Sequence, residues 1–306
     1  MRSEANEAEA HERTQWQLEL VSAIEAQFGD RMHHNLAAPG SALAADDEAL
    51  APFHTSHLLG HALSLSLDAL RSTRMLLTNP DTGGLQYPMA AHYSMLRTAL
   101  ESAAQAVWLL APADVELRRR RSLICRWSEV NYDDAAAVAA LADDPDDTTD
   151  EHRTKVKNLK RNRHEIRARK KQLREVATQN GLPESLFQQS YPGTGPLIRE
   201  AAAATGVKGS LARGTWQLVS GLTHPSASRS LMLSTVERLD DDGVSPVVAA
   251  RFTVNPAVTN MALDAALMMH FGALTFAADR GNVPALRWQP PAGLALPPRF
   301  RKLFRP

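Results

Sequence analysis

The chain has 306 residues, 44% apolar, 22% charged and 6% aromatic, and its 34 Lys and Arg residues balance 34 Asp and Glu residues. This balance argues against a surface that attracts nucleic acid or anionic membranes everywhere, and it leaves room for a local patch. The one cysteine, Cys125, excludes an internal disulfide and fits a reducing compartment. The first sixteen residues are polar and acidic and predict no secretory signal, so we expect a cytoplasmic protein.

The first half of the chain is predicted to be helical from its apolar spacing. Apolar residues four apart predict a helix over residues 5–28, and residues 30–52 predict a long irregular connection. Further helices are expected over residues 55–78, from about 88 to 110, and from 114 to about 141.

A long basic helix is expected over residues 149–179, after a Thr-x-x-Glu capping box formed by Thr148 and Glu151. Between residues 151 and 175 it carries eleven Lys and Arg residues against three Glu residues. Its apolar line is thin, with Leu159, Ile166 and Leu173 at seven-residue spacing. Such a line is typical of a helix on a surface or of a short coiled coil, and it is the predicted contact seam of a homodimer.

The last third predicts short helices, a helix ending near residue 222, and a β-hairpin over about 229–254 around an Asp-Gly turn. A final helix follows Asn255-Pro256, and a Pro-rich tail covers residues 284–306. The most apolar window, 257–278, contains Asn260, Asp264 and His270 and is interpreted as a buried helix, so no membrane contact is expected. The predicted fold is all-α, a multi-helix bundle in a single domain over residues 1–283.

Three histidines near the start of the second predicted helix could bind a metal. His57 and His61 are one helical turn apart, and His54, His92 or Glu101 could complete a ligand shell. The sequence has no Glu-x-x-His and no His-Glu-x-x-His motif, so a polar helix face is favoured and no cofactor is expected.

An acidic run, Asp143-Asp144-Pro145-Asp146-Asp147, matches the Asp-Asp-x-x-Asp pattern with which helical terpene cyclases hold magnesium on pyrophosphate. The run surrounds a proline rather than ending a helix, and aromatic residues are scarce in the chain. The second magnesium motif of those enzymes is missing as well. We therefore predict a solvated loop.

The basic helix is the candidate binding surface for RNA or for an acidic protein partner, because excess positive charge attracts phosphates and carboxylates. No aromatic residue interleaves the run, so base stacking is not indicated. The residues expected to bind are Lys160, Arg163, Arg167 and Lys171.

Two further segments place polar groups on apolar helices. Arg97 and Glu101 are four residues apart in one, and Ser220 and His224 are four residues apart in the other, beside a proline. Buried charges must be paired or serve a site, so either an Arg97–Glu101 ion pair with a capping His224, or a reactive site, explains the pattern.

These segments, residues 87–110 and 214–226, resemble bacterial helical proteins placed near the HEPN superfamily, known from abortive-infection and toxin systems. The resemblance implies an all-α bundle and RNA binding or cleavage in host defence. HEPN ribonucleases carry an Arg followed by a His four to six residues later, whereas this chain has the reverse order from His224 to Arg229. A catalytic His224 would need an arginine from elsewhere, and Arg97, Arg213 and Arg229 are the candidates.

The function predicted from the sequence is that of a non-catalytic, HEPN-like binding or regulatory protein that contacts RNA or a partner in a bacterial defence or stress setting. One alternative is a metal-independent ribonuclease in which His224 transfers a proton at a 2′-hydroxyl, Arg97 stabilises the phosphate and Glu101 orients Arg97. A second alternative is a metal-dependent helical enzyme that uses His57 and His61.

Overall fold

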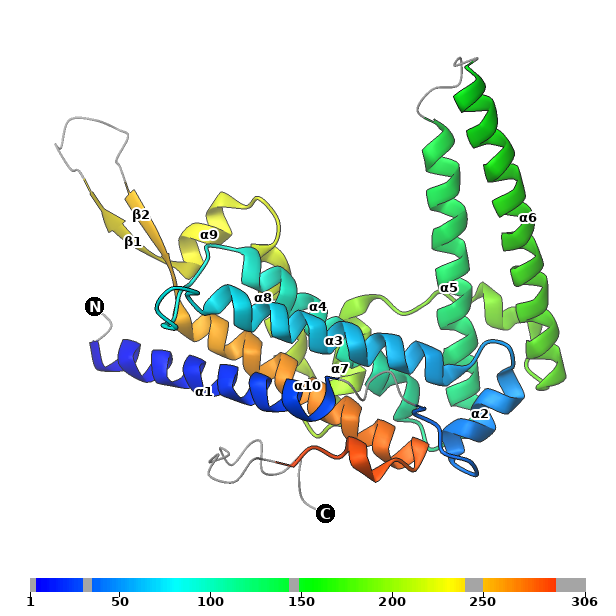
Figure 1. Cartoon of the computed structure of the whole chain (residues 1–306), viewed down its shortest axis with the longest axis horizontal. Coiled ribbons are helices and arrows are strands. Elements are labelled where there is room, and N and C mark those ends of the chain that lie inside the picture. Colours follow the sequence, from blue (N-terminus) through cyan, green and yellow to red (C-terminus); the bar gives the residue numbers. More distant parts are fainter. Residues whose placement is uncertain (1–3, 30–34, 143–148, 240–249, 290–306) are drawn as a thin grey trace. The chain divides into compact units, whose positions relative to one another are not determined.

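The computed structural model describes residues 4–29, 35–142, 149–239 and 250–289 (Figure 1). In these ranges the elements are helices, apart from one antiparallel hairpin late in the chain, which confirms the predicted fold class. The chain divides into two compact units: unit 1 is Met1–Leu36, Leu59–Ala111 and Gly193–Pro306, and unit 2 is Ala37–Leu58 and Pro112–Pro192. The single domain predicted over residues 1–283 includes parts of both units.

Unit 1 is built around one apolar helix, α10 (Pro256–Gly281), against which α1, α4 and α8 pack. Asn255 caps its start by accepting a hydrogen bond from the backbone N–H of Ala257. Apolar residues cover α10 on every side, which is typical of a helix at the centre of a core. The surrounding elements are α1 (Glu4–Phe28), the larger part of α3 (Thr55–Leu77), α4 (Ala91–Leu110), α7 (Thr194–Ala204), α8 (Gly209–Leu222), α9 (Ala227–Leu233), β1 (Ser234–Arg238), β2 (Ala250–Val254) and η3 (Pro284–Leu286).

Helix α10 is the one helix in the described ranges that is long and apolar enough to cross a bilayer, and 72% of its apolar window is buried inside the protein. This burial agrees with the predicted core helix. The packing is close at Gly272, where an added Cβ would lie 2.2 Å from Cγ2 of Thr205, so the residue that follows α7 approaches the helix backbone directly.

Two histidines are buried in unit 1. Ser66 donates its proton to the carbonyl of Ala99 and therefore accepts from Nδ1 of His270, at 2.9 Å. His92 Nε2 lies 3.0 Å from Oγ1 of Thr259. Burial lowers the pKa of each imidazole from 6.5 to about 4, so both rings are neutral at physiological pH.

Unit 2 contains α2 (Ala42–Leu50), α5 (Val115–Ala142), α6 (Asp150–Gln179) and η2 (Glu184–Gln188), and α5 and α6 lie side by side (Figure 1). Thr149 caps α6 by accepting from the backbone N–H of His152, one residue later than the predicted capping box. Ile166 is 7% exposed and Leu173 is fully buried, in a core shared with Leu123 and Val130 of α5. Two of the three residues of the predicted dimer seam are therefore covered within the chain, and the third, Leu159, is half-buried.

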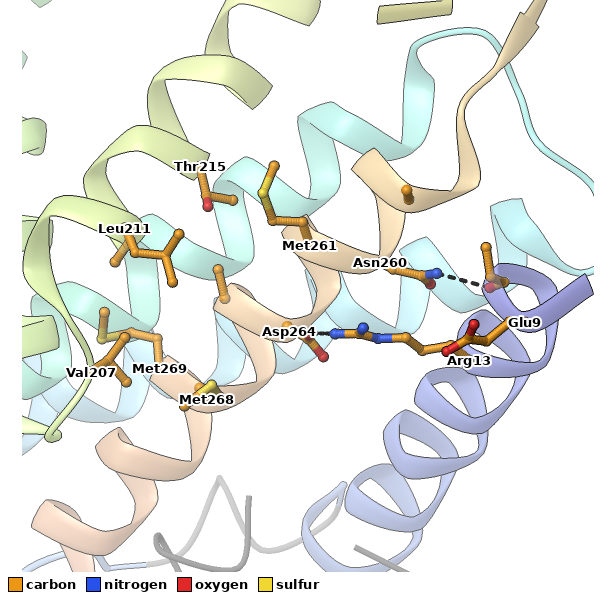
Figure 2. Close-up of a pocket in the computed structure, with 14 residues that line it drawn as sticks. Glu9, Arg13, Val207, Leu211, Thr215, Asn260, Met261, Asp264, Met268 and Met269 are labelled. Atoms are coloured by element: carbon orange, nitrogen blue, oxygen red, sulfur yellow. Dashed lines mark hydrogen bonds and ion pairs between the residues drawn. The ribbon is translucent and has the colours of Figure 1, made fainter. Parts of the chain in front are cut away.

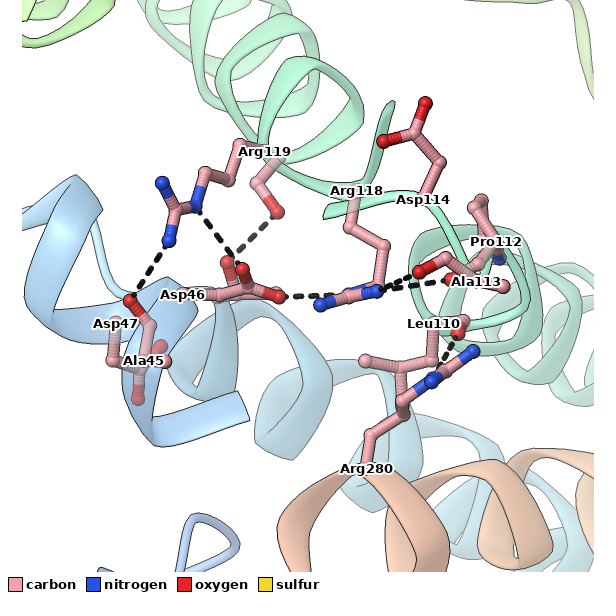
Figure 3. A network of polar contacts seen from close by, with 12 residues as sticks. Ala45, Asp46, Asp47, Leu110, Pro112, Ala113, Asp114, Arg118, Arg119 and Arg280 are labelled. Atoms are coloured by element: carbon pink, nitrogen blue, oxygen red, sulfur yellow. Dashed lines mark hydrogen bonds and ion pairs between the residues drawn. The ribbon is translucent and has the colours of Figure 1, made fainter. Parts of the chain in front are cut away.

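A buried carboxylate connects α2 to the start of α5 (Figure 3). Asp46 accepts from Nε of Arg118 at 2.8 Å and from Nε of Arg119 at 3.1 Å. Arg118 also donates to the carbonyls of Pro112 and Ala113, and Arg119 donates to Asn180 at the end of α6. These contacts give the buried polar groups of Asp46 and Arg118 hydrogen-bond partners, and the two side chains are only 1% and 3% exposed.

Two expectations for local structure are wrong. Residues 42–50, predicted as irregular, form α2, because Ser41 caps the helix and Asp46 is held by arginines from α5. The hairpin was expected to begin near residue 229, but residues 227–233 form the short helix α9, and β1 begins at Ser234. The acidic run at 143–147 and most of the predicted tail, residues 290–306, lie outside the described residues.

Candidate functional sites

The face of α6 that packs against α5 uses part of the basic charge for folding. Asp134 of α5 pairs with Lys170 at 3.2 Å and with Arg163 at 3.3 Å. The hydrogen bond from Lys170 is the main reason why the pKa of Asp134 lies below its ordinary value. Arg163, a predicted binding residue, therefore has a carboxylate partner inside the unit.

The opposite face of α6 carries cations without such partners. Four exposed residues, Lys157, Lys160, Arg161 and Arg167, make no ion pair or hydrogen bond with any described residue. At about 100° per residue they fall, with His164 and Lys171, within an arc of about 120° that extends about 21 Å along the helix. We call these six residues the basic stripe. Of these six residues, Lys171 alone forms an ion pair within the described ranges, with Glu175 at 3.6 Å.

The basic stripe has no apolar component. The exposed large apolar residues of the described ranges lie elsewhere in the chain, and none falls between residues 152 and 171. The neighbouring exposed side chains, Asn158, Asn162, Glu165 and Gln172, are polar. This surface offers charge and hydrogen-bond donors, which suits contacts to phosphate oxygens.

The two segments behind the HEPN resemblance come together in unit 1. Nε of Arg97 donates to Oε1 of Glu101 at 2.7 Å, and the indole N–H of Trp216 donates to the same oxygen at 2.6 Å. Nη1 of Arg97 lies 3.5 Å from Oγ1 of Thr223 at the end of α8. The cluster thus joins α4 to α8 through an ion pair whose members are about 30% exposed, at 32% and 29%.

The remaining residues predicted for this site lie around the cluster without completing it. His224 follows Thr223 and is exposed; its carbonyl accepts from the backbone N–H of Ser226 at 2.7 Å, and its imidazole bonds no described residue. Oγ of Ser220 and Nε of Arg213 are buried without a hydrogen-bond partner in the described ranges. Arg229 is exposed, lies over Gly221, and reaches the carbonyl of Gln217 at 3.4 Å. Arg97 bonds Thr223, the residue before His224, and its Nε bonds Glu101, so its guanidinium already has partners.

The histidines considered as metal ligands do not form a ligand shell. The rings of His54 and His57 have centroids 4.9 Å apart, and His57 and His61 are exposed on α3. His92 bonds Thr259, and Glu101 bonds Arg97 and Trp216, so both proposed completing ligands have other roles. Across the described residues, no group of three or more His, Cys, Asp or Glu side chains is arranged to hold a metal ion.

A pocket of about 420 Å³ lies in unit 1 between α1 and α8, with α10 as its floor (Figure 2). The pocket could not be predicted from local sequence patterns, because its walls come from residues about 200 positions apart in the chain. The polar residues Asn260 and Asp264 within the apolar window of α10 were the available indication, and both line the pocket.

No family model matches the sequence, and comparison with curated proteins and with solved structures found no match. Any ligand of this chain is therefore inferred from the chain's own geometry. Within the described ranges, two features have a composition suited to a ligand: the basic stripe of unit 2 and the pocket of unit 1.

Proposed function

We propose that the chain is a non-catalytic binding protein that holds the phosphate backbone of nucleic acid, with RNA as the first polymer to test, along the basic stripe of α6. The observation that supports this is the set of four exposed cations without a carboxylate partner in the described ranges, on the side of α6 opposite its packed face. Cations held in a row by a helix release counterions from a polyphosphate when they bind it.

The chemistry of the stripe favours nucleic acid over an acidic protein. Protein interfaces have an apolar, aromatic-rich centre with charges at the rim. The basic stripe has no exposed apolar residue at its centre and no aromatic residue along it. We therefore expect phosphate contacts without base stacking, and hence little dependence on nucleotide sequence.

Binding is tested by fluorescence anisotropy with a labelled RNA hairpin, a DNA duplex of equal length and polyglutamate. We expect the wild-type protein to bind RNA with a slope of log K against log salt of about −3 to −5, as four to six phosphate contacts give. The double variant Arg161→Gln with Arg167→Gln should reduce RNA affinity about tenfold in low salt. It should also make the slope of log K against log salt less negative by about 2, because two phosphate contacts are lost.

The matched control is Arg71→Gln with Arg287→Gln, which removes two exposed arginines that pair with Glu25 and Asp279 in unit 1. This control should bind RNA as the wild type does. Equal losses in the two double variants, or binding of polyglutamate in preference to both nucleic acids, would contradict the proposal.

The ribonuclease alternative is examined with the same RNA. The Arg97–Glu101 cluster is bonded within itself and to Trp216 and Thr223, so we expect no cleavage by the wild-type protein in the presence of EDTA. Cleavage by the wild type that His224→Ala abolishes would replace the non-catalytic proposal with a metal-independent ribonuclease.

A further inference from the structure

The pocket of unit 1 combines an apolar body with a polar wall on one side (Figure 2). Met261, Met268 and Met269 of α10 and Leu211 of α8 are the large apolar side chains among the lining residues, beside Val207. Methionine side chains are flexible and polarizable, so such a surface adapts to aromatic and branched ligands. A volume of about 420 Å³ suits a small organic molecule.

The polar wall carries a net negative charge. Arg13 of α1 forms an ion pair with Asp264 of α10, and Nε2 of Gln17 donates to the other carboxylate oxygen of Asp264 at 2.6 Å. Glu9, one turn before Arg13, also lines the pocket and has no ion pair with any described residue. Because Arg13 and Asp264 compensate each other, Glu9 leaves the wall with one uncompensated negative charge, which favours a cationic group and disfavours a carboxylate.

The opposite wall of the pocket carries the hydroxyl of Thr215. Thr215 of α8 is 3% exposed and lines the pocket. Its side chain makes no hydrogen bond within the ranges that the structure describes. The hydroxyl faces the pocket, so a ligand group there can donate a hydrogen bond to Thr215 or accept one from it.

We propose that this pocket binds a small aromatic amine, with its ring against the methionines of α10, its ammonium group toward Glu9 and Asp264, and a ring N–H or hydroxyl on Thr215. The pocket lies wholly in unit 1, so this proposal stands independently of the basic stripe.

The proposal is tested by isothermal titration calorimetry with three probes that share an indole ring: tryptamine, tryptophol and indole-3-propionate. We expect tryptamine to bind most tightly, tryptophol more weakly, and the carboxylate at least tenfold more weakly than tryptamine. Binding of the carboxylate as tight as that of the amine, or no heat with tryptamine at millimolar concentration, would overturn the proposal.

Variants locate the binding to this pocket. Glu9→Gln should weaken tryptamine about fivefold, as one charge at about 4 Å in water implies, and leave tryptophol unchanged. Glu19→Gln, an exposed position on the same helix outside the pocket, is the matched control and should change neither.

Ala265→Phe should fill the pocket and abolish binding of both probes, with its folding checked by circular dichroism. Thr215→Val should weaken tryptamine several-fold. A tryptamine affinity that none of the three pocket variants changes would place the binding elsewhere and overturn the proposal.

Discussion

Asp46 accepts hydrogen bonds from two arginines in the interior of unit 2, so its removal leaves a guanidinium buried without its counter-charge. We expect Asp46→Asn to lower the free energy of unfolding by about 3–5 kcal/mol, the range for breaking one partner of a buried ion pair. Urea unfolding followed by circular dichroism measures this loss. Asp68→Asn, at an exposed position of α3, is the control and should change stability by less than about 0.5 kcal/mol.

A double variant separates the effect of charge pairing at Asp46 from that of side-chain shape. Asp46→Leu combined with Arg118→Leu removes the two buried charges and leaves Arg119, whose side chain is 25% exposed, and apolar replacements of a buried pair are often neutral. The double variant should therefore be more stable than Asp46→Asn. If the two were equally unstable, the shape of the side chains rather than the charge pairing would be what holds α2 to α5.

The buried histidines give unit 1 a dependence on pH. In the unfolded chain His92 and His270 take up protons below pH 6.5, whereas burial lowers their pKa in the folded state to about 4. Stability from these groups is therefore complete above pH 6.5, is lost as the pH falls from 6.5 to about 4, and falls no further below that. By pH 5 the expected loss is about 2 kcal/mol for each histidine.

Urea midpoints measured from pH 7.5 to 5 test this dependence. The two side chains differ in their surroundings, since His270 bonds Ser66 and His92 bonds Thr259. His270→Asn should be less stable at pH 7.5 and should lose less additional stability on acidification than the wild type. If the urea midpoint of His270→Asn fell with pH as steeply as that of the wild type, groups other than His270 would cause the loss of stability in acid.

At the scale of the element, capping residues made the helices predictable. Asn255-Pro256 and the Thr residues before α6 placed the starts of α10 and α6 within one or two residues, because each cap bonds a backbone N–H that the helix itself cannot satisfy. Helix α2 was not predicted, because its nine residues are too few to show a helical period of apolar residues. The helix is also held in place by a distant contact, the hydrogen bond from Arg118 to Asp46, 72 residues apart.

The candidate sites were predictable only in part from the sequence. The charge of α6 is visible in the sequence, and so is the pairing of Arg97 with Glu101 at helical spacing. Which cations stay without partners depends on Asp134, whose neighbours are about 30 residues away, at Arg163 and Lys170. The pocket depends on three helices meeting, and local spacing carries no information on that.

Two glycines at helical positions provide a matched test of the packing of α10. Gly272→Ala should lower the free energy of unfolding by about 1–3 kcal/mol, because the added methyl would meet Thr205 at 2.2 Å. Gly60→Ala in α3 should raise it by about 0.5–1 kcal/mol, since the nearest atom, Cδ1 of Leu36, is at 3.5 Å and alanine favours the helix. Thermal unfolding of both variants measures these changes, and a stable Gly272→Ala would mean that Thr205 yields easily.

At the scale of the whole molecule, each unit is assembled from separated segments of the chain. Unit 2 uses two segments and unit 1 uses three, the last of which contains α10. Polar contacts in unit 1 join residues that are far apart in sequence: Thr14 bonds Asn260 across 246 positions, and Gln17 bonds Asp264 across 247. Unit 1 is therefore the part whose structure depends most on long-range contacts.

This arrangement has a consequence for synthesis on the ribosome. All residues of unit 2 have been made once Pro192 is added, whereas α1 must wait for α10 before its inner face is covered. At about 5–20 residues per second, the delay between Thr14 and Asn260 is on the order of ten seconds or more. During that time Leu20, Ile24 and Phe28, which are buried in the folded protein, have no α10 to cover them, and such transiently exposed apolar side chains are the surface that chaperones bind.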